Sequence, residues 1–460
     1  MTDRFPKGAL LAAVTAVLFV LLYLAYSRPG YFTSQTYLAE ALFLEVLLAA
    51  VWMYRQMFFP VVVVVFLFAG MGLPLGSGWN VARWVSLATG ALVGLLIVLK
   101  NREHHFGLFH IVALFAVLAG FVSVAVSRYT TLSLLKVLSL LLLFAYAGTG
   151  ARLAVFGREN RFFDGLLTSC EVFVGLVGAA YVSWFDVMGN PNSLGAVMGI
   201  VAAPILLWGT LASDQPSLRR RRALSFVVCA GLIFASNSRA AMIAGFLVCA
   251  LLCVALRKYR VLMQGIVILT ILASASAILR PESYSNTVSS LTREVLFKGK
   301  DPSLGVLSSR KSPWQDAVES IQTHWWFGTG FGTSDNGTDP TEHLGNFSTS
   351  SDTSKEHGSS YLAITAWVGL LGAVPFYMLL LMLFTKVVQT VAWMIRTGNA
   401  THPAIPLAMV MLAGLIHAGF EDWLFAPGYY ITVFYWCMAF VLVDYVPRLR
   451  DRTGRGQVGR

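Results

Sequence analysis

Residues 349–362 read Thr-Ser-Ser-Asp-Thr-Ser-Lys-Glu-His-Gly-Ser-Ser-Tyr-Leu, and they close the one long polar interruption in an otherwise membrane-like chain. The interruption runs from Pro281 to His357 and is rich in Ser, Thr, Asp and Gly, with apolar spans on both sides. A bilayer core excludes backbone polar groups that lack a partner, so this stretch must lie outside the membrane. We expect chemistry or recognition at this external segment.

The composition of the chain places it in the membrane. Of its 460 residues, 57% are hydrophobic and 12% are charged, whereas soluble domains carry about 25% charged residues. The formal net charge of +11 would suggest a nucleic-acid partner in a soluble protein, but here it is better explained by an excess of basic residues in cytoplasmic loops. The sequence therefore predicts an all-α polytopic membrane protein that binds no nucleic acid.

The cysteines give no sign of a disulfide or a metal site. All five lie in apolar spans, so the polar loop has no thiol to cross-link. No Cys-x-x-Cys pair with nearby histidines occurs, and we expect neither a metal nor another cofactor. The five are Cys170, Cys229, Cys249, Cys253 and Cys437.

Apolar stretches of about 20 residues, the length that crosses a bilayer, follow one another along the chain. We divide it into N-terminal transmembrane helices in 1–280, a periplasmic loop in 281–357, C-terminal transmembrane helices in 358–446 and a basic cytoplasmic tail in 447–460. The first stretch resembles a signal peptide, but it lacks a convincing cleavage pattern and is interpreted as a retained helix. About 12–14 transmembrane helices are expected, within 8–26, 37–54, 58–75, 81–99, 106–126, 130–151, 163–187, 192–213, 223–238, 240–256, 261–280, 358–385, 404–420 and 427–446.

Basic residues sort to one side of these spans and so predict the orientation. That side holds the N-terminal Arg4 and Lys7, the run Arg219–Arg222 and the basic tail, while the short loops of the other side hold little beyond Arg28, Arg83 and Arg128. Both termini are therefore expected in the cytoplasm. The polar loop then faces the exterior or the periplasm.

Two arginines are candidates for binding an anionic substrate on the external side. Arg239 follows Ser236-Asn237-Ser238 at a junction of two short spans, where small polar residues indicate a tight, hydrated turn. Arg310 lies in the polar loop. The alternatives are a snorkelling arginine at a helix end for Arg239 and a solvated loop arginine for Arg310.

A helix is predicted within the polar loop. Ser312 fits the N-cap, Pro313 the first helical position and Gln315 the third position of a capping box. An apolar stripe follows, which is typical of a short amphipathic helix lying along the membrane surface. In this interpretation Arg310 precedes the helix start, where free N–H groups also attract anions. The stripe consists of Trp314, Ala317, Val318, Ile321 and Trp325.

Other motifs face the same side. The stretch Phe327-Gly328-Thr329-Gly330-Phe331-Gly332 would let backbone approach a phosphate or sugar, or would form a plain loop. His357, at the mouth of a membrane cavity, is a candidate general base, with Glu356 beside it. Glu421 and Asp422 are adjacent acids at a further helix end and are candidates for acceptor binding or for the base. The turn Asn190-Pro191-Asn192 is expected to be structural.

Taken in order, these segments resemble the O-antigen ligase and polymerase family of bacterial envelope polysaccharide enzymes. The resemblance covers roughly residues 185–375. The matching stretches are Gly189-Asn190-Pro191-Asn192-Ser193-Leu194-Gly195, Ser236-Asn237-Ser238-Arg239, Arg310 with Trp314, Phe327-Gly328-Thr329-Gly330-Phe331-Gly332, and Ser360-Tyr361-Leu362 followed by Val368-Gly369-Leu370-Leu371-Gly372.

The resemblance implies a function in O-antigen, lipopolysaccharide or exopolysaccharide biosynthesis. The family implies transfer of an oligosaccharide from undecaprenyl diphosphate, outside the inner membrane and without a metal, to a glycan or lipid-linked acceptor. It casts Arg239 and Arg310 as binders of the donor diphosphate. Membrane lipids and an envelope polysaccharide export complex are the further partners that it suggests.

The chain departs from the family pattern at the histidine of ligases, which lies three residues before the aromatic residue of the last motif. Gly358 occupies that position here, and His357 is shifted by one residue. A shift of one residue rotates a helical side chain by about 100°, unless the residue lies in a loop. The base therefore stays open among His357, Glu356 and an acid near Glu421, and a polymerase is favoured over a ligase.

Two other classes compete with a glycosyltransferase. A flippase or other transporter of lipid-linked oligosaccharides would also have many spans, but the single long loop and the lack of an internal repeat argue against it. A structural scaffold for an envelope synthesis complex would need no cluster of polar residues.

Overall fold

A computed structural model describes residues 58–71, 76–100, 106–183, 188, 190–278, 308–333 and 357–447 of the chain. The expected spans 8–26 and 37–54, the basic tail, Glu356 and most of the polar loop lie outside these residues. Within them the regular structure is entirely helical.

The described helices follow the spans expected from the sequence, which confirms an all-α polytopic membrane protein. Five of them are long and apolar enough to cross a membrane, and the shorter apolar helices also fall on expected spans. The elements are α3 (Phe59–Gly70), α4 (Gly76–Lys100), α5 (Leu108–Val124), α6 (Thr130–Tyr146), η3 (Ala147–Ala151), α7 (Arg152–Val155), α8 (Glu159–Val182), α9 (Pro191–Ala196), η4 (Val197–Ala202), α10 (Ala203–Ala212), α11 (Pro216–Ala235), α12 (Arg239–Ala255), α13 (Tyr259–Ile278), α15 (Ser308–Thr323), α16 (Ser360–Thr397), α17 (Ala404–Ala418) and α18 (Tyr430–Tyr445).

The core of the bundle lies around α17 and α18. Side chains of α18 from Tyr430 to Leu442 are all buried, and α17 is buried on nearly every face. Helices at the periphery instead expose large apolar side chains, such as Leu176 on α8 at 66% and Leu381 on α16 at 63%. Because lipid solvates such side chains, this distribution fits helices that face a bilayer.

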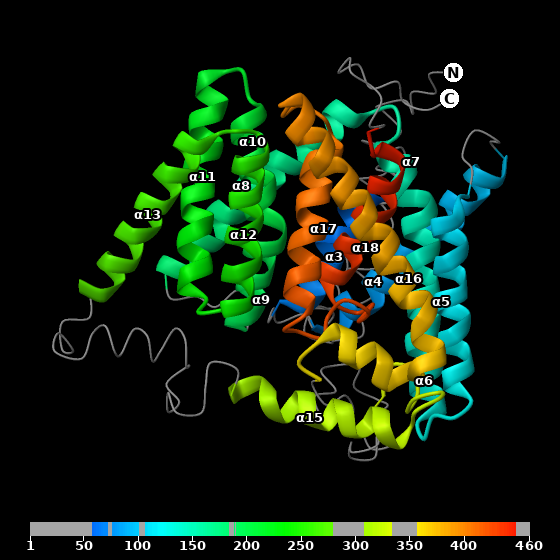
Figure 1. The fold of residues 1–460 in the computed structure, drawn as a ribbon. Helices are drawn as coiled ribbons and strands as arrows, with labels where there is room; N and C mark the ends of the chain where they lie inside the picture. Colours follow the sequence, from blue (N-terminus) through cyan, green and yellow to red (C-terminus); the bar gives the residue numbers. More distant parts are fainter. Residues whose placement is uncertain are drawn as a thin grey trace, which may run out of the picture.

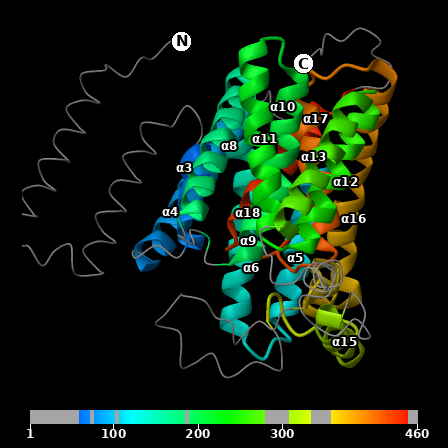
Figure 2. The same ribbon diagram turned by 90° about the vertical axis from the view of Figure 1, so that its left-hand side faces the viewer.

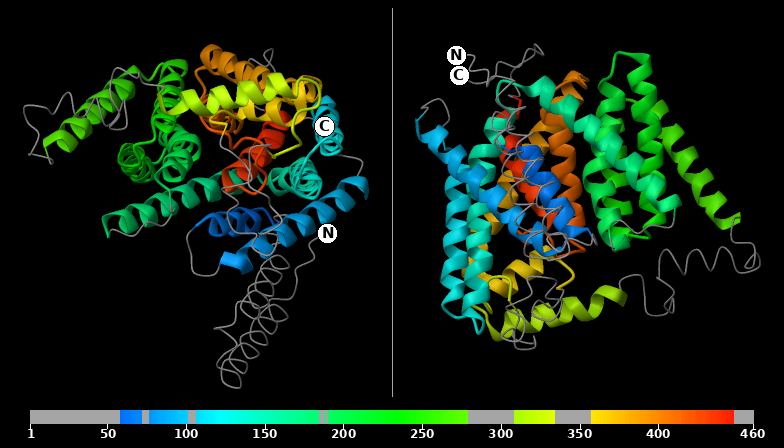
Figure 3. Two further views of the ribbon diagram at one scale, coloured as in Figure 1. Left: turned by 90° about the horizontal axis from the view of Figure 1, so that it is seen from below. Right: turned by 180° about the vertical axis from the view of Figure 1, so that it is seen from behind.

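The helix α15 lies across one end of the bundle. Figure 1 shows it crossing below the roughly parallel α5, α16, α17 and α18, and the view from below in Figure 3 shows it over that same end. Figure 2 shows α10 and α12 close to α17, against which both pack. Thus α15 covers the end of the bundle where α12 and α16 begin.

The expected start of this surface helix is wrong. It begins at Ser308, so Ser312 is not its N-cap and Pro313 lies inside it. A proline removes one backbone hydrogen bond and crowds the preceding turn, but a helix can continue through it at that cost. Arg310 is consequently the third residue of α15 and does not precede it. The apolar stripe is only partly buried: Ala317 is enclosed, while Val318 and Trp325 are exposed.

A sharp bend in α16 positions this end of the bundle. Gly369 adopts a left-handed φ of 69°, so the first part of α16 runs in a different direction from the rest (Figure 1). The Gly-rich residues 328–332, which we call the glycine turn, follow α15 and pack against the bend. Thr329 N donates to Ala366 O and Gly330 N donates to Trp367 O, both at 3.0 Å. A Cβ on Gly369 would lie 2.3 Å from the carbonyl carbon of Trp326.

These contacts decide what the glycine turn does. Its glycines allow two backbones to approach closely, and the N–H groups of Thr329 and Gly330 are already bonded to α16. The turn therefore connects α15 to α16, in agreement with the alternative that this stretch forms a plain loop. These two N–H groups are not available to bind a phosphate or sugar.

We predict that the end of the bundle carrying α15 faces the periplasm. In intact cells a membrane-impermeant maleimide should label Ser350→Cys in the polar loop. It should label Thr397→Cys, at the opposite end of α16, only after permeabilisation. The five native cysteines are buried and give little background. Labelling of Ser350→Cys only after permeabilisation would overturn this orientation.

Candidate active site

Four helices bring distant charged residues together at the end of the bundle covered by α15. Helix α12 packs against α17 and α16, and α16 packs against α15 and α17. We name the charged cluster by its five residues: Arg239, Arg310, His357, Glu421 and Asp422. They come from the starts of α12 and α15, the segment before α16 and the segment after α17.

Arg310 and Glu421 form the ion pair at the centre of the charged cluster. The guanidinium donates to the Glu421 carboxylate, and the two side chains are only 15% and 14% exposed. Because water screens such a partly buried pair less than a surface pair, the contact orders both side chains. Glu421 is also anchored through its backbone oxygen, which accepts from Ser360 N at 3.0 Å and from Ser360 Oγ at 2.7 Å.

Arg239 is the first residue of α12 and extends from the tight turn that the sequence predicts. Asn237 in this turn has a left-handed φ of 50°. Ser236 Oγ donates to Ile233 O at 2.7 Å and accepts from Ser238 N at 3.3 Å. The turn directs Arg239 to the side of Arg310, where the two positive charges repel one another. An anion with two negative charges would relieve this repulsion.

His357 is buried next to Asp422. Its backbone N–H donates to Asp422 Oδ2 at 2.9 Å, and its Nδ1 lies 3.9 Å from the same oxygen. The imidazole and the ring of Trp367 are nearly perpendicular, with centroids 5.8 Å apart. His357 precedes α16 and is not helical, so the rotation expected from a one-residue shift within a helix does not arise.

The structure adds two residues to this region that the sequence reasoning missed. Lys136 on α6 donates to Gly332 O, and its charge is attracted by Asp422. A lysine inside a predicted span was the available signal, because ionisable groups at membrane depth are costly. Tyr429, just before α18, donates to Ser193 Oγ at 3.3 Å.

The Asn190 turn has the structural role expected of it. The Asn190 side chain caps α9 by accepting from Asn192 N at 2.8 Å. A Cβ on Gly195 would lie 2.6 Å from both Ser236 Oγ and Ser238 Cβ. The close approach of α9 therefore supports the turn that carries Arg239.

Among the residues that the structure describes, no three His, Cys, Asp or Glu side chains are grouped so that they could hold a metal ion. The expectation of a metal-free site stays a prediction. Arginine and lysine supply the positive charge that the described cluster offers to an anion.

The fold and the charged cluster define a class of multi-pass membrane enzyme with a polar site at one end of its helices. Residues 224–377 match the family model described as O-Antigen ligase. Over these residues, which are less than half of its length, the chain is similar to the O-antigen ligase family, and this similarity supports an enzyme of the glycosyltransferase type. The match includes Arg239, Arg310 and His357, whereas Glu421 and Asp422 lie beyond it. No curated protein matches the chain.

Proposed function

We propose that this protein transfers an oligosaccharide from undecaprenyl diphosphate to a glycan acceptor during O-antigen or exopolysaccharide biosynthesis, on the periplasmic side of the inner membrane. The observation that carries the proposal is the convergence of Arg239 and Arg310 with His357 and its carboxylate neighbours at one end of the bundle. A donor diphosphate and an acceptor hydroxyl each find a suitable group there.

The arginines bind the leaving group in this proposal. Arginine stays charged at any physiological pH and grips phosphate oxygens through a planar fork of N–H donors. A diphosphate inserted between Arg239 and Arg310 offsets their mutual repulsion and competes with Glu421 for Arg310. As the bond between the anomeric carbon and the diphosphate breaks, the electron pair passes to the phosphate oxygen, and the fixed guanidinium charges stabilise it there.

His357 is the proposed general base. Nδ1 lies 3.9 Å from Asp422 Oδ2, and we assign the other ring nitrogen, Nε2, to accept the proton of the acceptor hydroxyl. The acceptor oxygen then bonds to the anomeric carbon, and undecaprenyl diphosphate departs. Asp422 orients the imidazole and stabilises its positive form, while Glu421 binds the acceptor once the diphosphate has taken its place on Arg310. Glu356 stays an alternative base.

A polymerase is favoured over a ligase because Gly358 occupies the position of the ligase histidine. The ligase is the second candidate, since the matching family model is described as O-Antigen ligase. A flippase is disfavoured because three basic residues gather at the end of the bundle that α15 covers: Arg239 starts α12, Arg310 lies on α15, and Lys136 bonds to the turn after α15.

Glycan transfer by the purified protein without divalent cations tests the proposal. We expect a lipid-linked repeat unit to be converted to a ladder of longer glycans in the presence of a chelator, because two arginines replace the metal that would otherwise neutralise the diphosphate. Transfer only to a lipid A core acceptor would identify a ligase. Loss of transfer with the chelator, restored by magnesium, would contradict the metal-free mechanism.

A further inference from the structure

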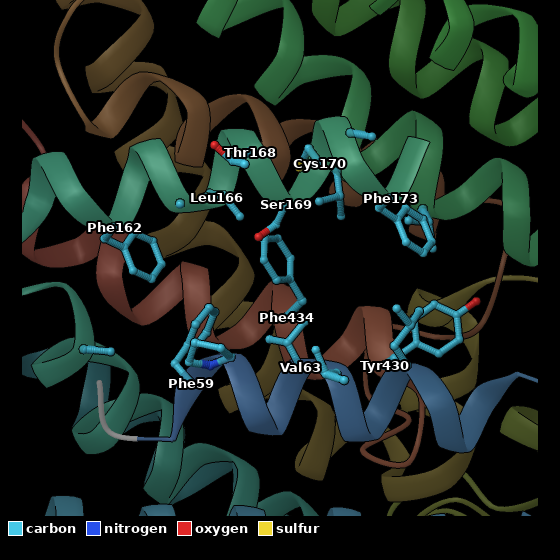
Figure 4. Close-up of a pocket in the computed structure, with 18 of the residues that line it drawn as sticks. Phe59, Val63, Phe162, Leu166, Thr168, Ser169, Cys170, Phe173, Tyr430 and Phe434 are labelled. Atoms are coloured by element: carbon cyan, nitrogen blue, oxygen red, sulfur yellow. The ribbon is translucent and has the colours of Figure 1, made fainter. Parts of the chain in front are cut away.

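A large apolar groove runs along the membrane-spanning part of the molecule between α3 and α8. Its volume is about 1020 Å³. Residues of η4 and α18 also line it. Figure 4 shows Phe59 and Val63 on α3 opposite Phe162, Leu166 and Phe173 on α8. The other apolar residues that line it are Pro60, Val64, Leu67, Ala154, Val197, Val201, Ala202, Ile431 and Phe434.

The groove is mainly apolar, with Thr168 and Ser169 on its α8 side and charged residues at one end. Arg158, Arg161 and Asp164, from the start of α8, line that end. Phe173 and Tyr430 line the opposite end (Figure 4). An elongated apolar channel with one aromatic end suits a hydrocarbon chain, and its walls offer few partners for a polar ligand.

The aromatic end of the groove adjoins the charged cluster. The ring of Tyr430 lies 4.5 Å from the ring of Tyr429, whose hydroxyl donates to Ser193 Oγ. Ser193 belongs to α9, and α9 packs against the tight turn of residues 236–238 that precedes Arg239. A chain attached to a phosphate at Arg239 would therefore meet the groove at this end.

We propose that the groove between α3 and α8 holds the polyisoprenoid tail of the lipid-linked donor whose diphosphate is bound by the charged cluster. This inference rests on the proposed function and adds a binding site for the lipid portion of the substrate. A phospholipid is a poorer occupant because nothing ties its headgroup to the charged cluster. Since lipid is as apolar as the groove, the tail gains little from leaving the bilayer. The groove instead orients the donor and places its diphosphate at the arginines.

Two glycines on α8 provide a matched pair of variants that tests the groove. Gly165 lines it and Gly175 does not. A Cβ at either position would meet no atom within 4 Å, so a larger side chain is tolerated at both. Gly165→Trp should raise the KM for the undecaprenyl-linked donor about tenfold, whereas Gly175→Trp should leave it unchanged. A donor with a tail of only two isoprene units should show the same KM with both variants and the wild type. Equal KM values of the two variants for the undecaprenyl-linked donor would overturn the proposal.

Photo-crosslinking locates the tail without relying on activity. A benzophenone amino acid at Val63, in the groove, should form an adduct with undecaprenyl diphosphate in nanodiscs, and one at Leu176, a lipid-facing residue of α8 at 66% exposure, should form far less. Phospholipid adducts alone at Val63 would overturn the proposal. If the protein transfers glycan but forms no tail adduct at Val63, the groove assignment alone fails. If the adduct forms but no transfer occurs, the proposed function alone fails.

Discussion

Replacing Arg310 or Arg239 by alanine is expected to lower glycan transfer by about 100-fold or more, the usual cost of removing one donor that stabilises a developing negative charge. Lysine at either position keeps the charge but loses the planar fork of donors, so transfer should still drop sharply, by about tenfold. Initial rates with a lipid-linked donor at saturating acceptor measure both effects. Full activity of both the lysine and the alanine variants would contradict the assignment.

The control for this experiment lies next to Arg310. Lys311 is also basic and on α15 but is exposed, so Lys311→Ala should retain transfer. Arg310→Ala also removes the partly buried ion pair with Glu421, which can destabilise the fold. Thermal unfolding of each variant separates this effect: a catalytic loss should appear in variants that unfold near the wild-type temperature, Arg239→Ala and Arg310→Lys in particular.

His357→Ala is expected to lower transfer about 100-fold, the smallest effect that loss of a general base usually has. Initial rates with the lipid-linked donor measure this loss, and the exposed His324→Ala should retain transfer as the control.

A small loss of transfer in His357→Ala would mean that another group acts as the base. A change below tenfold, about 1.4 kcal/mol of barrier, would reject His357 as the base and would favour the polymerase over the ligase. Asp422→Asn gives an independent test, because its carboxylate lies 3.9 Å from His357 Nδ1. If Asp422 orients the imidazole, the asparagine variant should lose rate without raising the KM for the donor.

The sequence predicted the helices well because each transmembrane span is recorded locally, in about 20 consecutive apolar residues. The span expected at 192–213, for example, is realised as α9, η4 and α10, which together run from Pro191 to Ala212. The sequence was less reliable for the exact ends of helices than for their existence. The capping box at Ser312 marked a start that the structure does not use, and the span after Gly358 continues to Thr397 as a single bent helix.

The geometry of the candidate site was less accessible to sequence reasoning. Arg310 and Glu421 are 111 positions apart, and nothing in either local pattern indicates that they pair. The same holds for Lys136, which α6 brings to the turn after α15. External placement of Arg239, Arg310 and His357 followed from charge asymmetry and family resemblance, but their mutual arrangement depends on how α12, α15, α16 and α17 pack.

The affinity of the purified protein for undecaprenyl diphosphate tests the central assignment most directly, because it requires neither acceptor nor base. In nanodiscs with a chelator present, we expect the wild type to bind undecaprenyl diphosphate more tightly than undecaprenyl monophosphate. Arg239→Ala and Arg310→Ala should each weaken diphosphate binding at least tenfold, whereas Lys311→Ala should not. Equal affinity of the wild type and both arginine variants for the diphosphate would contradict a diphosphate site at Arg239 and Arg310.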